Sequence, residues 1–126
     1  MSGSAVLRRD RASACEPDSL FRALGDPTRV RIVNLLAAGE LCVCDLVELL
    51  GLPQPTISRH LAVLRVSGLV WTRRRGRYSH YGLAKPSSAL HAVLLQGLRG
   101  HLDTLPLSAE RSQAHARVAE RRHSPC

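Results

Sequence analysis

The sequence predicts a mostly α-helical fold with a small β-hairpin wing, arranged as a winged helix-turn-helix that assembles as a homodimer. Three observations lead to this fold class. Residues 43–66 read as two short helices separated by Gly51 and Pro53. Residues 69–72 and 78–81 read as two strands around Arg75 and Gly76. Residues 88–105 carry an apolar stripe that predicts packing against a second copy of the chain.

The composition indicates a single domain with a polyanionic partner. The 126 residues have a formal net charge of +8, and Lys85 is the only lysine, so the positive charge is almost entirely guanidinium. Arginine offers bidentate contacts to phosphates and base edges. A GC-rich genome that favours arginine codons is the alternative source of this bias. Aromatic residues make up only 3%, so the core must be aliphatic.

Composition along the chain divides it into three parts. We expect a flexible N-terminal arm over residues 1–17, a winged helix-turn-helix DNA-binding and dimerisation domain over 18–105, and a polar C-terminal tail over 106–126 that is partly helical or disordered. No segment approaches the ~20 apolar residues that cross a membrane, and the N-terminus lacks the apolar core of a signal peptide. We therefore expect a cytoplasmic protein with no membrane partner, whose four cysteines are reduced.

Two helices are predicted ahead of the helix-turn-helix, over residues 19–24 and 28–38. Asp26 is expected to cap the second of them, with Pro27 at its first position. In the first helix we expect three residues to face inward: Leu20, Phe21 and Leu24.

The helix-turn-helix supplies the candidate DNA contacts. Its first helix covers residues 43–50 and ends at Gly51, and Pro53 prevents it from continuing. The second begins near Gln54 or Pro55 and enters the major groove in this architecture. Its apolar residues, Ile57, Leu61 and Leu64, should be core. Its polar residues are candidate contacts to double-stranded operator DNA: Gln54, Thr56, Ser58, Arg59 and His60. For His60, packing within the protein is the alternative.

The wing carries the second candidate DNA surface. Four arginines lie within five positions, and we place them at the wing tip: Arg73, Arg74, Arg75 and Arg77. Beside a recognition helix, such a cluster is expected to contact backbone phosphates or a minor groove. A solvated basic face is the alternative.

The last predicted helix carries apolar residues at mixed spacings of three and four. They are Leu90, Val93, Leu94, Leu98, Leu102 and Leu105. Dimerisation through this helix suits a DNA-binding protein of this size, because two half-sites double the contacts.

Cys42 and Cys44 form a Cys-x-Cys pair where the helix over residues 43–50 begins. The helix dipole at this end favours thiolates, which bind soft metals. Residues two apart in a regular helix point to opposite sides. Both sulfurs can therefore reach one ion only if the segment lies before the first full turn or unwinds. We expect binding to deform the helix that supports the recognition helix. The alternative is that both cysteines are small buried hydrophobic residues.

The motifs together resemble a known family. The sequences DPTR at 26–29, ELCVCDL at 40–46 and QPTISRHL at 54–61, followed by the wing, are similar to the ArsR/SmtB family of metal-responsive repressors over residues 18–105. The resemblance implies a winged-helix homodimer built on its first and last helices. It further implies that the dimer represses a resistance operon and leaves its operator when metal binds.

One departure from the family pattern concerns the inducer. Arsenic repressors of this type often carry a third cysteine, suited to three-coordinate As(III), where this chain has Val47. We expect Cys15 to replace it, since related cadmium and lead sensors bring N-terminal cysteines to this motif. Cys126 is the competitor, and two thiolates alone are a third option. As(III) or Sb(III) is the expected inducer, with Cd(II) or Pb(II) second.

Other function classes fit less well. An arsenate reductase needs an arginine six residues after its cysteine, and that pattern is absent, so we do not expect an enzyme. A repressor that senses oxidation through a disulfide at Cys42 or Cys44 is an alternative that the sequence leaves open. The basic wing and the SRHL sequence at 58–61 argue against a partner-binding module that uses the last helix without an inducer. His91, His101 and Asp103 do not rebuild the zinc site that some family members carry on the last helix.

Overall fold

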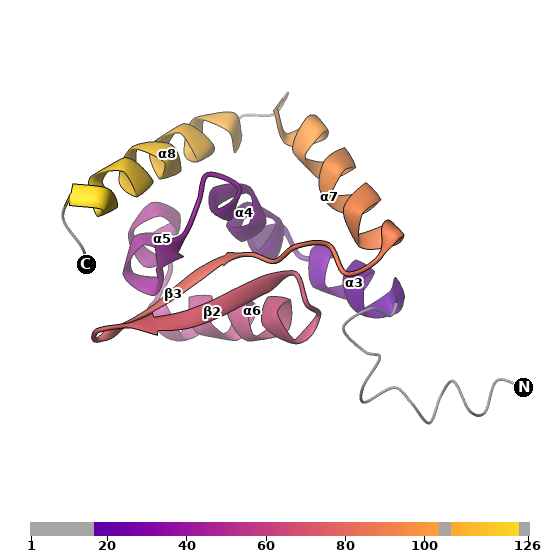
Figure 1. The fold of residues 1–126 in the computed structure, drawn as a ribbon, viewed down its shortest axis with the longest axis horizontal. Coiled ribbons are helices and arrows are strands. Elements are labelled where there is room, and N and C mark those ends of the chain that lie inside the picture. The colour runs from indigo at the N-terminus through magenta and orange to yellow at the C-terminus, as the bar shows by residue number, and fades with distance from the viewer. Residues whose placement is uncertain (1–16, 104–106, 124–126) are drawn as a thin grey trace, which may run out of the picture.

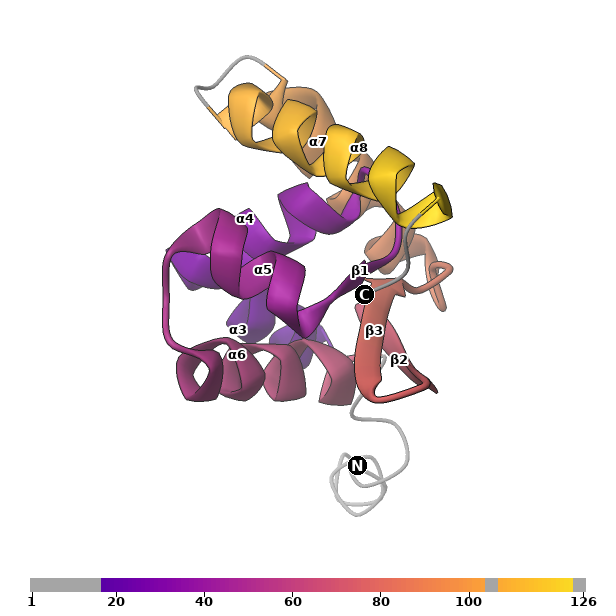
Figure 2. The same ribbon diagram turned by 90° about the vertical axis from the view of Figure 1, so that its left-hand side faces the viewer.

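The computed structural model describes residues 17–103 and 107–123. In chain order the elements are α3 (Pro17–Leu24), α4 (Pro27–Leu36), β1 (Leu41–Cys42), α5 (Val43–Leu50), α6 (Gln54–Val66), β2 (Val70–Arg75), β3 (Tyr78–Leu83), α7 (Ala89–Leu102) and α8 (Leu107–His123). In Figure 1, α7 and α8 pass over α4, while α6 lies at the opposite side of the molecule. Figure 2 shows the same layering from a second direction. The mostly α-helical fold with a wing is confirmed. No helix in these ranges is long and apolar enough to span a membrane.

The helix-turn-helix forms as predicted. Helix α5 has the expected bounds, and Gly51 ends it in the left-handed conformation (φ 68°), with its N–H donating to the carbonyl of Val47. Helix α6 begins directly after Pro53. Its three apolar residues, Ile57, Leu61 and Leu64, are fully buried and turn α6 onto the core.

The wing belongs to a three-stranded antiparallel sheet of order β1-β3-β2. Strands β2 and β3 pair from Val70↔Leu83 to Arg75↔Tyr78 and are longer than predicted. Strand β1 was not predicted, because a two-residue strand shows no periodicity in the sequence. Its pairs, Leu41↔Tyr81 and Cys42↔His80, join the first cysteine of the pair to the wing.

The placement of the wing arginines needs a correction. Arg73, Arg74 and Arg75 lie within strand β2, and Arg77 alone lies in the turn, next to Gly76 (φ 66°). The hairpin therefore extends further than its β-branched residues suggested. Only the end of the basic cluster is at the wing tip.

The N-terminal helices follow their capping signals. Asp26 caps α4 by accepting from the N–H of Thr28 at 2.8 Å and of Arg29 at 3.2 Å. The prediction for Phe21 was wrong: its side chain is 56% exposed. Helix α3 buries Leu20 and Ala23, which are three residues apart, and the adjacent position points to solvent.

Helix α7 is capped by Ser88, whose Oγ accepts from the N–H of His91. It buries Leu95 and Leu102, whereas Val93 is 64% exposed. The predicted stripe therefore points partly away from this chain's own core. Leu105 lies outside the described residues.

Residues 107–123, within the predicted C-terminal tail, form a helix. Helix α8 covers residues that we expected to be partly helical or disordered, and it packs on α4 and α5. Ala114 is completely buried, and Val118 lies against Gly39. Arg31 of α4 forms a bidentate pair with Glu110. The contacts of α8 combine two apolar side chains with ion pairs to α4 and α5, so the helix carries no continuous apolar stripe from which this packing could be predicted. The division of the chain into arm, domain and tail stays a prediction.

Candidate DNA-binding surface and cysteine site

The outer face of α6 presents the predicted polar residues. Gln54, Ser58 and Arg59 are exposed, and Thr56 is half-buried. The opposite face of α6 is buried in the core through Ile57, Leu61 and Leu64. This packing fixes the orientation of α6, so the polar side chains face outward. Such a surface suits insertion into a major groove.

His60 differs from the other predicted contacts. Its Nδ1 lies 3.3 Å from Nη1 of Arg29 and 3.9 Å from Oδ1 of Asp26, at the junction of α6 with α4. Arg29 also donates to the carbonyls of Ala23 and Arg22 in α3. The structure therefore places His60 in a packing network that links three helices.

This network perturbs Asp26. Burial opposes ionisation of this carboxyl, but the backbone N–H groups of Arg29 and Thr28 and the nearby positive charges outweigh it. The pKa of Asp26 is consequently lowered from its ordinary value.

Two of the four wing arginines are engaged by Glu40, a residue that the sequence analysis did not single out for this role. Nη2 of Arg73 lies 2.6 Å from the Glu40 carboxylate, and Nη1 of Arg75 lies 3.5 Å from it. The buried His80 contributes Nδ1 at 3.3 Å. Burial opposes ionisation of Glu40, but Arg73 and the other charges lower its pKa. Arg74 and Arg77 are exposed and form no ion pair with any residue that the structure describes.

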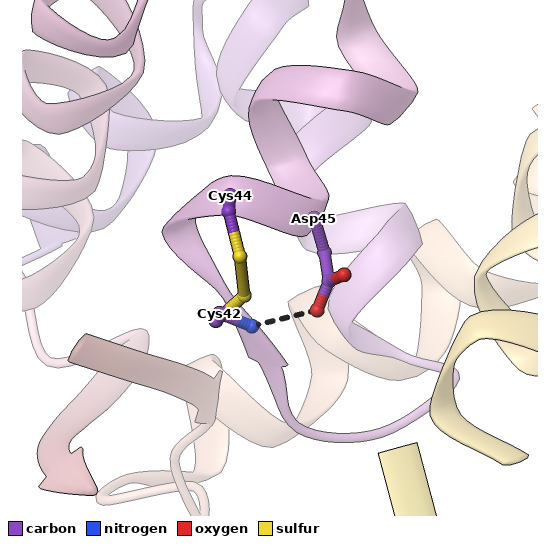
Figure 3. Close-up of side chains that lie close together, drawn as sticks. All are labelled: Cys42, Cys44 and Asp45. Atoms are coloured by element: carbon purple, nitrogen blue, oxygen red, sulfur yellow. Dashed lines mark hydrogen bonds between the residues drawn. A yellow bond between two sulfur atoms is a disulfide. The ribbon is translucent and has the colours of Figure 1, made fainter. Parts of the chain in front are cut away.

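The sulfur atoms of Cys42 and Cys44 meet, and the structure joins them as a disulfide with Cα atoms 5.3 Å apart (Figure 3). For these two residues the structure differs from the expectation that the cysteines are reduced. Cys42 ends β1 in an extended conformation (φ −87°, ψ 165°), while Cys44 lies in the first turn of α5. The pair therefore lies where α5 begins, before its first turn is complete. This is one of the two arrangements in which both sulfurs can reach a single ion. Helix α5 is regular over Val43–Leu50 with the two sulfurs joined, and the deformation of α5 by a bound ion stays a prediction. Cys42 is fully buried, whereas Cys44 is exposed.

Asp45 completes the surroundings of the pair. Its Oδ2 accepts from the Cys42 N–H at 3.0 Å, as Figure 3 shows. One possible ligand atom from each of Cys42, Cys44 and Asp45 lies within 4.8 Å of the others. Nη1 of Arg117 in α8 reaches Oδ1 of Asp45 at 3.3 Å and Oε2 of Glu48 at 2.6 Å. The three-residue spacing from Cys42 to Asp45 could have revealed the local contact, but nothing in the sequence pointed to Arg117.

A groove of about 460 Å³ lies beside Cys44, between α5, the start of α6 and the wing. Its lining includes Cys44 and Val47 of α5, Gln54 of α6, and Arg74, Arg77 and Tyr78 of the wing. The structure thus brings the exposed cysteine together with three of the predicted DNA contacts. The remaining candidate ligand, Cys15, and its competitor, Cys126, lie outside the described residues.

Comparison with known proteins relates the chain to bacterial regulators. Residues 26–72 match the family described as "Bacterial regulatory protein, arsR family". The "Arsenical resistance operon repressor" of Escherichia coli (strain K12) is 55% identical over 80 residues, which cover 63% of this chain and 68% of that protein.

Solved structures agree on the fold. The transcriptional repressor BigR from Xylella fastidiosa is 35% identical with a TM-score of 0.57, and the match covers 80% of this chain and 96% of that one. The homodimeric winged helix-turn-helix DNA-binding domain Mb0332 from Mycobacterium bovis is 27% identical with a TM-score of 0.59, covering 82% and 87%.

Proposed function

Since this chain belongs to the ArsR family of bacterial regulatory proteins, we propose that it is a metalloid-responsive repressor. The chain is a DNA-binding transcriptional repressor of the ArsR/SmtB type. In the proposal, a homodimer binds operator DNA through α6 and the wing. As(III) or Sb(III) bound by Cys42 and Cys44 releases the dimer, and resistance genes are then transcribed.

The meeting of two cysteine sulfurs at the start of α5 is the observation that carries this proposal. Reduction of the disulfide gives two neighbouring thiols at this point. Soft thiolate ligands select soft ions, and a helix N-terminus favours the thiolate form. Helix α5 packs directly on α6. An ion at this point is therefore one helix away from the DNA-reading surface. The E. coli relative is named for arsenical resistance, which supports a metalloid over other soft ions.

Exposed apolar side chains support the homodimer. Phe21 of α3 and Val93 of α7 are 56% and 64% exposed, although both are large hydrophobic residues. These are the first and last helices of the expected dimerisation domain, and Mb0332 is homodimeric. A second copy would cover these side chains.

We also propose which residue supplies the third ligand to the ion. Cys15 is our preferred third thiolate, with Cys126 as its competitor. Cd(II) or Pb(II) is the alternative inducer, because thiolate number and geometry decide between these ions.

A second candidate function is a thiol redox switch, and the disulfide between Cys42 and Cys44 favours it. In that case oxidation of the pair would release DNA without any metal.

DNA release from the native promoter fragment, measured by fluorescence anisotropy in reducing buffer, tests the proposal. As(III), Sb(III), Cd(II), Pb(II) and Zn(II) are titrated into wild type and into Cys15→Ser, Cys44→Ser and Cys126→Ser. Cys44 is exposed, so its substitution should leave the fold intact. We expect As(III) to release wild type and not Cys44→Ser. Release by peroxide in buffer without reductant, but by no metal in reducing buffer, would instead establish the redox switch.

A further inference from the structure

The groove beside Cys44 has the features of a site for a small anion. Its volume of about 460 Å³ is within the range of small-molecule sites. Two guanidinium groups, Arg74 and Arg77, line it from the wing, and neither forms an ion pair with a described residue. The first turn of α5 adds the positive end of a helix dipole. Among the described residues, none that lines the groove carries a carboxylate.

The position of the two sulfurs indicates where a third ligand would enter. Cys42 is fully buried and fixed to the sheet, while Cys44 is exposed and is the cysteine that lines the groove. Val47, where some arsenic repressors have their third cysteine, also lines the groove and offers no ligand atom. A third ligand that comes from outside the protein would therefore reach the pair through the groove, on the side of Cys44. The carboxylate of Asp45, within 4.8 Å of both sulfurs, is the alternative ligand from the protein.

We infer that this groove binds a small anionic thiol, which supplies the third sulfur ligand to As(III) held by Cys42 and Cys44. The inference rests on the proposed function and specifies its inducer as an arsenic–thiol complex. Arg74 and Arg77 would pair with the carboxylates of that thiol.

The exchange starts from the reduced pair: two molecules of the small thiol first reduce the Cys42–Cys44 disulfide and leave as their own disulfide. The exchange itself then needs no further oxidant or reductant. An As(III) tris-thiolate enters the groove, and the two protein thiols replace two of its three thiolates. Two As–S bonds break and two form, and the two cysteine protons leave on the departing thiols. Arsenic remains As(III), and one small thiolate stays bound in the groove.

The groove also offers a route to DNA release that needs no unwinding of α5. Gln54, Arg74 and Arg77 are predicted DNA contacts, and all three line the groove. A carboxylate-bearing ligand there would compete with DNA phosphates for the same two guanidinium groups. Inducer binding would thereby weaken the DNA contact directly.

The test measures As(III) binding to the full-length, pre-reduced protein without DNA, in anaerobic buffer. Glutathione serves as the anionic thiol, β-mercaptoethanol as the neutral one, and a third arm contains no thiol. Ultraviolet absorbance of the As–S bonds gives affinity, and native mass spectrometry gives the composition of the complex. The double variant Arg74→Gln/Arg77→Gln is compared with Arg65→Gln/Arg99→Gln, which removes two exposed arginines outside the groove lining.

We expect a complex of one arsenic and one glutathione per cysteine pair. Two exposed charge pairs should make binding about tenfold tighter with glutathione than with the neutral thiol. Arg74→Gln/Arg77→Gln should lose this preference, and the control variant should keep it.

Two results would overturn the inference while leaving the proposed function intact. One is a complex that contains arsenic but no small thiol and is lost in Cys15→Ser, which would assign the third sulfur to the protein. The other is equal affinity with both thiols. If As(III) binds under none of the three conditions, the proposed function fails together with the inference.

Discussion

Arg117 of the C-terminal helix α8 reaches the carboxylate of Asp45, 72 positions earlier in the chain, at 3.3 Å. Asp45 is 1% exposed, and its other oxygen accepts from the backbone N–H of Cys42. The Asp45 carboxylate therefore bridges Arg117 of α8 and the backbone N–H of Cys42. This relationship makes α8 a part of the cysteine site's framework.

Removal of the Arg117 guanidinium should destabilise the protein. In Arg117→Ala the buried Asp45 loses this cationic partner, and we expect a loss of roughly 1–3 kcal/mol in the free energy of unfolding. Urea denaturation measures it. Gln113, an exposed residue of the same helix, provides the control, since Gln113→Ala should change stability by less than about 0.5 kcal/mol. Equal stability of the two variants would show that the contact with Asp45 contributes nothing.

Gly82 in β3 should tolerate no side chain. A Cβ at this position would collide with the ring of Trp71, its cross-strand partner. We expect Gly82→Ala to lower the free energy of unfolding by about 1–3 kcal/mol, because the ring or the hairpin must shift. In Gly100→Ala the added Cβ meets no atom within 4 Å and lies in helix α7, so that variant should be neutral or stabilised by up to about 1 kcal/mol. Thermal unfolding of the pair checks the prediction.

Stability should fall in acid through Asp26. Burial opposes its ionisation, but the backbone donors of the α4 cap outweigh burial, so its pKa is lower in the folded protein. The stabilisation is therefore present above the unfolded value of about 3.9 and is lost as pH falls through the lower folded value. Asn can cap the helix but cannot titrate. Urea unfolding between neutral pH and about pH 3 should show a smaller acid loss for Asp26→Asn than for wild type. Parallel curves for the two proteins would contradict the assignment.

The wing arginines should differ in their contribution to DNA binding. Arg73 is paired with Glu40 at 2.6 Å, whereas Arg74 has no ion pair among the described residues. A guanidinium that neutralises a phosphate releases counterions, so Arg74→Gln should reduce the slope of log K against log salt by about 1 if the side chain neutralises one phosphate. Arg73→Gln should reduce it less. Anisotropy titrations over a salt series measure both slopes, and a larger effect of Arg73→Gln would reverse the assignment.

Short-range signals explain which parts of the fold were predictable. Asp26 was recognisable as a cap because its acceptor binds N–H groups two and three residues ahead. The bounds of α5 followed from Gly51 and Pro53, and the buried face of α6 followed from apolar spacing. The Cys42–Cys44 pair was recognisable for the same reason, since two neighbouring ligands need no tertiary structure to be noticed.

The sequence by itself determined the helix-turn-helix, the wing, the basic charge and the position of the cysteine pair, because caps, turns and periodicity act over a few residues. Only the tertiary structure decided that Cys42 is buried while Cys44 opens onto a basic groove. It also decided that Phe21 points outward and that Glu40 holds Arg73. Likewise, it brought Arg117 to Asp45. The two ion pairs join residues far apart in the chain, so they form only when the helices and the sheet pack. The exposure of Phe21 and of Cys44 depends on the same packing.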